Sequence, residues 1–178
     1  MKKPENQIIV IFGGRGDLAV RKIIPALFTL FRQGLMPEKF AVVGTGRNAV
    51  TDEAYRQEVH EAANGGSNFS DKEVIAGFTS AFSYVTVNPS VPEDYSVLSE
   101  SLKTVRDCLG IGENTLFYLS VPPALYDDIT NNLAVRGLNK GQSGWKRVII
   151  EKPFGYDFKS AVGLNRLLLE CWDESQLY

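Results

Sequence analysis

The chain has 178 residues, of which 44% are hydrophobic and 22% charged, and its formal charge is −2, from 19 Lys and Arg against 21 Asp and Glu. This length and apolar content predict one domain with a substantial core. Because charges of both signs are interspersed without a basic run, the composition argues against nucleic acid or an anionic membrane surface as partner. No stretch is long enough to span a bilayer. Cys108 and Cys171 lie far apart in the sequence, which is typical of reduced thiols in a cytoplasm.

An apolar run followed at once by glycines opens the chain. Residues 8–12 (IIVIF) predict a fully buried strand of a parallel sheet. Apolar residues then recur at helical spacing, at Leu18, Ile23, Ile24, Leu27, Phe28, Leu30 and Phe31. Between them, a G-x-G-x-x-A spacing starts at Gly14 and a G-x-x-G-x-x-A spacing starts at Gly13. This strand, turn and helix favour a dinucleotide-binding turn, whose exposed amides and helix dipole hold a pyrophosphate, although such turns also occur without a ligand.

A second apolar run, residues 40–43, predicts the next buried strand. The segment after it, 44–47 (GTGR), lies where a dinucleotide fold meets the adenosine ribose. NAD-specific sites place a carboxylate there, but the first acidic residue after this segment is Asp52. Arg47 can instead hold a 2′-phosphate through paired, charge-assisted hydrogen bonds. We therefore expect NADP as the cofactor, with NAD less favoured, while an exposed loop arginine remains the alternative explanation of Arg47.

The rest of the chain alternates between helical and strand patterns. Helices are expected over residues 51–63, from residue 70, and over 92–109, 124–135 and 158–172, and further strands over 82–87, 115–120 and 145–151. In the first of these helices Thr51 is the expected N-cap, and His60, the only histidine, is expected to be structural. Its solvent side carries Glu53, Glu58 and Glu61. This alternation predicts an α/β fold with right-handed crossovers, a Rossmann-like doubly wound parallel sheet in three αβα layers over 1–178.

Several longer motifs carry a family resemblance. They are GDLAVRKIIPAL at 16–27, GLMP at 34–37, VGTGR at 43–47, FYLSVPP at 117–123 and EKPFGYD at 151–157. In this order they closely resemble the coenzyme domain of the glucose-6-phosphate dehydrogenase family. The resemblance implies a cytoplasmic, homo-oligomeric parent enzyme that oxidises glucose 6-phosphate to 6-phosphogluconolactone by hydride transfer to NADP, in the pentose phosphate pathway.

The motifs and the resemblance together indicate a set of cofactor contacts, namely Gly13, Gly14, Arg15, Gly16, Asp17, Leu18, Arg47, Tyr118 and Lys152. The resemblance also implies that Lys152 contacts the substrate, and Pro153 holds its backbone extended. Tyr118 is equally well explained by core packing. Asp17 also suits the first helical turn and can pair with Arg21 at i,i+4. Lys22 either reaches the crevice or lies in solvent.

Arg15 departs from the family pattern, which has serine or threonine at this position. Three interpretations stay open. The guanidinium could be a second cation for the 2′-phosphate, it could crowd the pyrophosphate, or it could point into solvent.

No residue of the chain is a convincing catalytic base, which the oxidation of an alcohol by hydride transfer requires, and no metal-ligand spacing is present. In the resembled family the base is a histidine in a downstream RIDHYLGK motif, followed by a large second domain. We therefore expect these 178 residues to be a coenzyme domain that binds NADP weakly and is inactive alone. The alternatives are a non-catalytic NADP-binding module and a sugar oxidoreductase of another family that shares the Glu-Lys-Pro motif.

Overall fold

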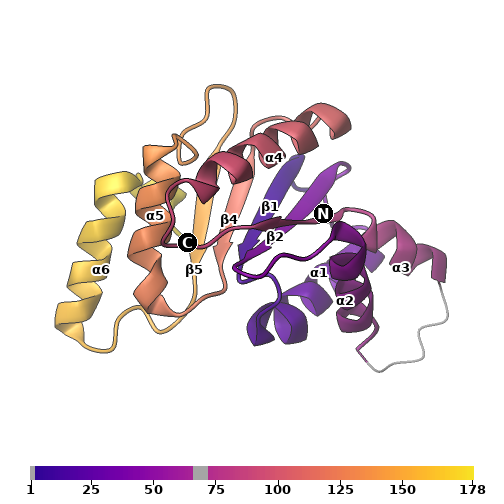
Figure 1. The fold of residues 1–178 in the computed structure, drawn as a ribbon, viewed down its shortest axis with the longest axis horizontal. Coiled ribbons are helices and arrows are strands. Elements are labelled where there is room, and N and C mark those ends of the chain that lie inside the picture. Colours follow the sequence, from indigo (N-terminus) through magenta and orange to yellow (C-terminus); the bar gives the residue numbers. More distant parts are fainter. Residues whose placement is uncertain (1–2, 66–71) are drawn as a thin grey trace.

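The computed structural model describes residues 3–65 and 72–178, and its centre is a sheet of five parallel strands (Figure 1). The strands lie in the order β3-β2-β1-β4-β5. Their bounds are β1 Gln7–Phe12, β2 Phe40–Gly46, β3 Phe82–Thr86, β4 Thr115–Leu119 and β5 Lys146–Ile150. All four strand pairings are parallel. The predicted doubly wound parallel sheet is therefore confirmed.

Helices cover both faces of the sheet (Figure 1). One face carries α1 Ile24–Arg32, α2 Asp52–Asn64 and α3 Lys72–Thr79, and the other carries α4 Asp94–Leu109, α5 Tyr126–Val135 and α6 Phe158–Cys171. Short helical turns lie at η1 Ala19–Ile23, η2 Pro123–Leu125 and η3 Glu174–Gln176. The chain changes face between β3 and β4, because the crossovers stay right-handed while the strand order reverses direction. The result is the expected three-layer αβα arrangement.

Local sequence signals set most element ends. The Thr51 hydroxyl accepts a hydrogen bond from the Ala54 amide at 3.2 Å and caps α2, as predicted. Gly110 is left-handed, with a φ of +60°, and ends α4. The second strand runs to Gly46, three residues beyond its predicted end, because Gly44, Thr45 and Gly46 continue the pairing with β3.

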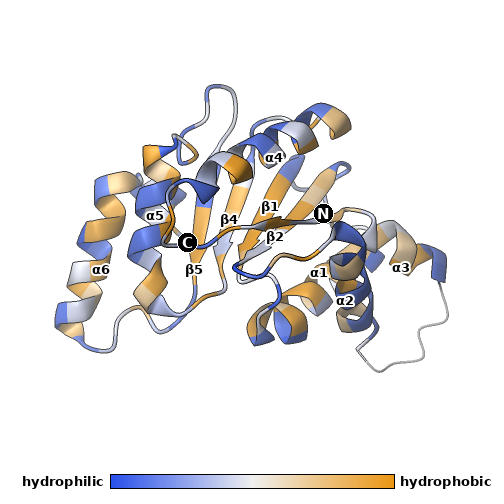
Figure 2. Cartoon of the chain, in the orientation of Figure 1, coloured by the Kyte–Doolittle hydropathy of each residue, from blue (hydrophilic) through white to orange (hydrophobic). Residues whose placement is uncertain are grey.

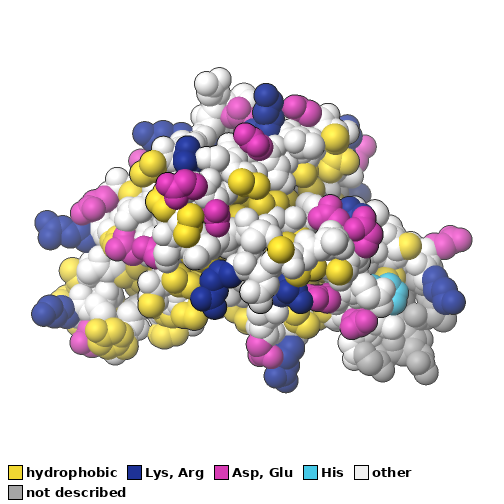
Figure 3. Space-filling view, viewed as in Figure 1, with side chains coloured by type: hydrophobic (Ala, Val, Ile, Leu, Met, Phe, Trp, Pro, Cys, Tyr) yellow, Lys and Arg dark blue, Asp and Glu magenta, His cyan; other side chains and the backbone are white. Residues whose placement is uncertain are grey.

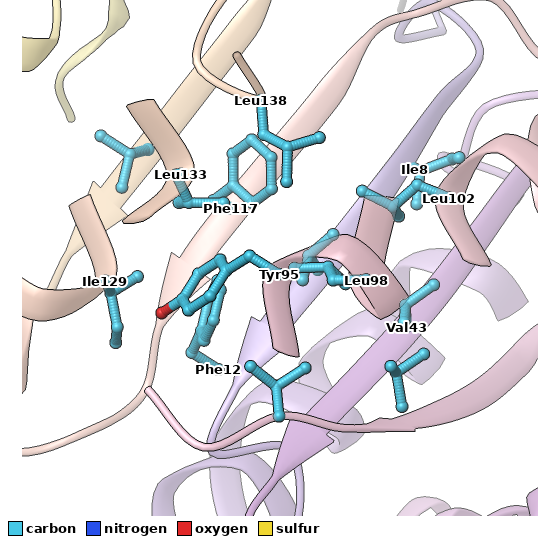
Figure 4. Packing of buried hydrophobic residues seen from close by; sticks show 14 of the residues in the cluster. Ile8, Phe12, Val43, Tyr95, Leu98, Leu102, Phe117, Ile129, Leu133 and Leu138 are labelled. Carbon is cyan, nitrogen blue, oxygen red and sulfur yellow. The ribbon is translucent and has the colours of Figure 1, made fainter. Parts of the chain in front are cut away.

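Two apolar clusters fill the space between the sheet and its helices. Alternate strand residues supply each cluster, so that Ile8 and Val10 face α4 and α5 while Ile9 and Ile11 face α1 and α2. The strands are accordingly apolar along their length, whereas the helices are two-sided (Figure 2). In the first cluster the rings of Phe12 and Tyr95 stack with centroids 6.2 Å apart (Figure 4). Burial on both faces explains why the strands read as unbroken apolar runs.

One residue of the predicted apolar stripe lies outside the core. Leu30 is 40% exposed, whereas Ile23, Ile24 and Phe28 are buried. The helix is wound as a π-helix over Ala19–Ile23 before α1 begins. Within α1 itself the spacing is 3.6 residues per turn, so Ile24, Phe28 and Phe31 share the face toward the core and Leu30 lies roughly a third of a turn away from it.

The surface carries interspersed charges of both signs, as the face in Figure 3 shows. Within the described residues, no helix is both long and apolar enough to cross a membrane. The same residues contain no cluster of three or more His, Cys, Asp or Glu side chains arranged to hold a metal ion.

Candidate functional site

The candidate site lies at the carboxyl ends of β1 and β4, where the direction of winding changes. After β1 the chain turns toward α1 on one face, and after β4 it turns toward α5 on the other. The residues that leave the two strands, Gly13 and Ser120, lie against each other. In open α/β sheets a crevice opens at such a switch point and receives the ligand.

Two glycines of the turn have no room for a side chain. Gly13 has a φ of +78°, and a Cβ there would overlap the carbonyl oxygen of Ser120. A Cβ on Gly14 would lie 2.7 Å from the Cα of Gly44. The turn is therefore pressed against both neighbouring strands and leaves bare backbone at the crevice. Gly16 closes the turn by donating to the Gly13 carbonyl at 2.8 Å.

The backbone amides of the turn differ in whether they already have a hydrogen-bond acceptor within the protein. The Gly13 and Gly14 amides both donate to the Thr45 carbonyl at 3.0 Å, and the Gly16 amide is also paired. The amides of Gly13, Gly14 and Gly16 are therefore all paired within the protein. The amides of Arg15, Asp17 and Leu18 have no acceptor outside the helix among the described residues. They lie at the start of the helical segment, where its positive dipole end favours an anion.

Two more of the predicted cofactor contacts, Asp17 and Leu18, lie in the first helical turn. Asp17 accepts a hydrogen bond from Arg21 at 3.4 Å, and their side chains are 80% and 73% exposed. The predicted i,i+4 pair is thus confirmed, and its exposure makes it worth little for stability. Leu18 is half-buried and lines a cavity of about 330 Å³. The cavity lies beside α1 and is also lined by Lys22, Tyr118 and Glu151, while Lys22 itself is exposed.

Tyr118 and Glu151 join the ends of β4 and β5. The Tyr118 hydroxyl donates to the Glu151 carboxylate. Burial and the contact with Glu151 raise the pKa of Tyr118 well above its usual value, so the hydroxyl keeps its proton. Tyr118 is therefore partly buried and has a polar partner, which fits neither pure core packing nor a free hydroxyl. Lys152 lies two residues beyond the end of β5 and is exposed, and its peptide bond to Pro153 is cis.

The two arginines occupy different surroundings. Arg47 follows β2, is exposed and has no hydrogen-bond or ion-pair partner within residues 3–65 and 72–178. Arg15 donates from Nε and Nη2 to the two carboxylate oxygens of Glu58, at 2.7 and 2.6 Å. The hydrogen bond to Glu58 raises the pKa of Arg15 further. The interpretation that Arg15 points freely into solvent is therefore wrong.

Three residues near the site were not singled out from the sequence. Ser120 has a buried hydroxyl without a hydrogen-bond partner among the described residues, directly beside the turn. Its position after an apolar run, in the FYLSVPP motif, could have indicated it. Glu58 was assigned to the solvent side of its helix, and no local pattern shows that it pairs with Arg15, 43 residues away. Glu151 was noted only as part of the motif that contains Lys152.

These features fit the phosphates of a dinucleotide. The glycine turn presents bare backbone and unpaired amides to the crevice, and the Ser120 hydroxyl lacks a partner in the described part of the chain. Arg47 supplies an unpaired cation at the end of β2. Pyrophosphate oxygens are the acceptors that such donors lack.

Comparison with known proteins agrees with this geometry. A family model described as "Glucose-6-phosphate dehydrogenase, NAD binding domain" matches residues 10–178. The glucose-6-phosphate 1-dehydrogenase of Aggregatibacter actinomycetemcomitans is 40% identical, over 99% of this chain and 35% of that protein. That of Bacillus subtilis is 39% identical, over 96% of this chain and 34% of that protein.

Solved structures give the same result. A glucose-6-phosphate dehydrogenase in complex with its substrate glucose-6-phosphate superposes with a TM-score of 0.89 and 31% identity, over 100% of this chain and 37% of that chain. The Mycobacterium avium glucose-6-phosphate 1-dehydrogenase superposes with a TM-score of 0.81 and 30% identity, over 98% of this chain and 36% of that one. The chain thus spans about a third of the length of these relatives. The alternative Glu-Lys-Pro family is not favoured. The chain belongs to the glucose-6-phosphate dehydrogenase family and corresponds to its nicotinamide-dinucleotide-binding domain.

Proposed function

We propose that residues 1–178 form the NADP-binding domain of an enzyme that oxidises glucose 6-phosphate to 6-phosphogluconolactone. The observation that carries this proposal is the glycine turn at the switch point, with Gly13 and Gly14 packed against neighbouring backbone and Arg47 at the end of β2. A turn without Cβ atoms allows a pyrophosphate to approach the backbone. An arginine at the end of β2, with no acidic residue in the loop between it and Asp52, favours a 2′-phosphate over a 2′-hydroxyl.

Each residue has a distinct role in this proposal. The amides of Arg15, Asp17 and Leu18 donate to the pyrophosphate, together with the Ser120 hydroxyl. Arg47 binds the 2′-phosphate. When bound, the coenzyme supplies the acceptor for a hydride from the sugar.

Two residues from the ends of β4 and β5 complete the site toward the substrate. Tyr118 donates to Glu151 and lines the cavity beside Leu18. The Lys152 ammonium binds the nicotinamide end and the sugar phosphate from the end of β5.

The base that removes the hydroxyl proton is assigned to a part of the enzyme that the match does not cover. The relatives are about three times as long as this chain. Near the site, Tyr178 donates its amide to the Val148 carbonyl and accepts from the Ile150 amide, both at 2.9 Å. Residues 177–178 therefore run parallel to β5 and lead the backbone toward the edge of the sheet that carries Lys152.

Calorimetric titration with NADP and NAD tests the coenzyme assignment. We expect NADP to bind about ten- to a hundredfold more tightly than NAD, because a charge-assisted bidentate contact of Arg47 is worth about 1.5–3 kcal/mol. Arg47→Ala removes this difference, whereas Arg166→Ala, at an exposed position on α6, keeps it. Flat heats for both coenzymes at millimolar concentration contradict the proposal.

Absorbance at 340 nm tests the assignment of catalysis. We expect no reduction of NADP by this chain with glucose 6-phosphate, since it lacks the base, and turnover by the longer protein that contains it. Turnover by the chain alone shows that the base lies within it.

We also propose that the longer protein is a cytoplasmic homo-oligomer, which is consistent with the unpaired thiols of Cys108 and Cys171. One relative, from Arabidopsis thaliana, is named as cytoplasmic.

A further inference from the structure

A charged pair stands at the side of the crevice nearest to β2. Arg15 extends from the turn after β1, and Glu58 extends from the middle of α2. The two N–H···O contacts, at 2.7 and 2.6 Å, make the pair bidentate, which orients the guanidinium as well as attracting it. The side chains are 34% and 35% exposed, so solvent and ligands reach the pair from one side.

Two tyrosines show where this pair lies in the crevice. A Cβ on Gly46 would lie 2.5 Å from the Tyr84 hydroxyl, so Tyr84 covers the end of β2. Burial raises the pKa of Tyr84, and the adjacent Arg15 guanidinium opposes this shift. Tyr84 therefore touches both Gly46 and Arg15, which places the ion pair at the end of β2, immediately before Arg47.

The charged side chains at this corner leave one net positive charge. Arg15 and Arg47 contribute two positive charges, and Glu58 contributes one negative charge. A carboxylate at the end of β2 is the group that accepts from a ribose 2′-hydroxyl and repels a 2′-phosphate. Glu58 is such a carboxylate, but it arrives from α2, and its two oxygens are occupied by Arg15.

Resting on the coenzyme binding proposed above, we infer that Glu58 is a specificity-determining residue of this site. Its carboxylate holds Arg15 at the adenosine-ribose corner and offsets its charge, so the preference for NADP is smaller than two free arginines would give. Arg15 in turn masks Glu58, which would otherwise repel the 2′-phosphate. The pair moderates the selectivity that Arg47 imposes and leaves NAD an acceptable coenzyme.

Adenosine 2′,5′-bisphosphate and 5′-AMP are suitable probes, because they differ only in the 2′-phosphate and carry no nicotinamide. The ratio of their dissociation constants, measured by calorimetry, therefore reports how strongly the residues at the adenosine-ribose corner favour a 2′-phosphate. We expect Glu58→Gln to raise the preference for the bisphosphate about tenfold and Arg15→Thr to lower it about tenfold. The double variant lacks both charges and returns to within about threefold of the parent ratio. Both single effects shrink at 0.5 M salt, because exposed charges are screened.

The control variant is Glu100→Gln, which removes one exposed carboxylate from α4 on the opposite face of the sheet. It leaves the ratio unchanged, and circular-dichroism melting confirms that each variant is folded. A ratio unaltered by Glu58→Gln overturns the inference. So does Arg15→Thr if it tightens both probes alike, since that is the result expected from crowding at the pyrophosphate. If neither probe binds the parent chain, the proposed coenzyme site itself is wrong.

Discussion

At the scale of single residues, the glycine turn shows how close packing and backbone conformation act together. Gly13 and Gly34 both have positive φ, at +78° and +67°. Only Gly13 is crowded, by the Ser120 carbonyl and the Val121 side chain, whereas nothing lies within 4 Å of a Cβ at Gly34. The two positions therefore separate the cost of backbone conformation from the cost of a clash.

Gly13→Ala is expected to lower the free energy of unfolding by about 3 kcal/mol, from about 1 kcal/mol of backbone strain plus overpacking against β4. Gly34→Ala is expected to lower the free energy of unfolding by only about 1 kcal/mol, because it introduces backbone strain without a clash. Urea denaturation followed by circular dichroism measures both. Equal losses contradict the clash, and a Gly13→Ala chain that still binds NADP with parent affinity contradicts the role of the turn.

Lys146, the first residue of β5, is 5% exposed and donates to the Glu113 carbonyl and to the Thr115 hydroxyl. Burial, with repulsion from Arg106, lowers the pKa of Lys146 to about 8. Between this value and the unfolded value near 10.4, the unfolded chain binds the proton and the folded chain does not. The free energy of unfolding therefore rises with pH in this window.

We expect Lys146→Met to remove this rise between pH 8 and pH 9, because above that range tyrosines that are buried in the folded chain lose their protons in the unfolded chain. The parent gains on the order of 1 kcal/mol across the window. Urea midpoints at four pH values measure the slope. Lys103→Met, at an exposed position of α4, keeps it. A slope that survives in Lys146→Met assigns the titration to another group.

At the scale of elements, side-chain caps and left-handed residues define the helices that bring site residues together. The Thr51 cap begins α2, which carries Tyr55 under the glycine turn and Glu58 against Arg15. The Tyr55 hydroxyl donates to the Gly14 carbonyl at 3.3 Å, so a side chain of α2 is hydrogen-bonded to the backbone of the glycine turn. The stability of α2 and the geometry of the site are thus linked.

Thr51→Ala removes the acceptor for the Ala54 amide and is expected to lower the free energy of unfolding by about 1 kcal/mol. Thr104→Ala is the matched control, since its hydroxyl only bonds back to the Glu100 carbonyl within α4. Chemical denaturation compares the two. A loss in Thr104→Ala as large as that in Thr51→Ala contradicts a capping effect.

At the scale of the whole molecule, the doubly wound sheet joins two halves whose helices lie on opposite faces (Figure 1). The glycine turn belongs to the half with β1 and β2, whereas Ser120, Tyr118 and Lys152 belong to the half with β4 and β5. A dinucleotide bound across the switch point contacts both halves and is expected to stabilise the entire fold.

NADP at ten times its dissociation constant should add about 1.4 kcal/mol to the stability of the native state. For a chain of this size the expected rise in Tm is about 3–5 °C. Scanning calorimetry measures it, with nicotinamide mononucleotide at the same concentration as the control that lacks the adenosine half. An equal rise with the mononucleotide contradicts binding across both halves.

Much of the architecture follows from local patterns. The runs at residues 8–12 and 115–120 and the cap at Thr51 each depend on a few neighbouring residues, and the structure confirms all three. The position of the crevice follows as well, because strand and helix order determine where the winding reverses. Leu30 was misplaced, because the predicted apolar stripe was wider than the face of α1 that packs against the core.

The sequence by itself therefore determined the fold class, the strands, most helix ends and the glycine turn, because backbone preference and apolar periodicity act over a few residues. Only the tertiary structure decided that Arg15 pairs with Glu58, that Tyr118 bonds to Glu151, and that Ser120 lies against Gly13. These contacts join segments from different strands and helices, and they depend on how the layers pack. The charge of the ribose corner, and with it the inferred coenzyme selectivity, thus belongs to the packed molecule.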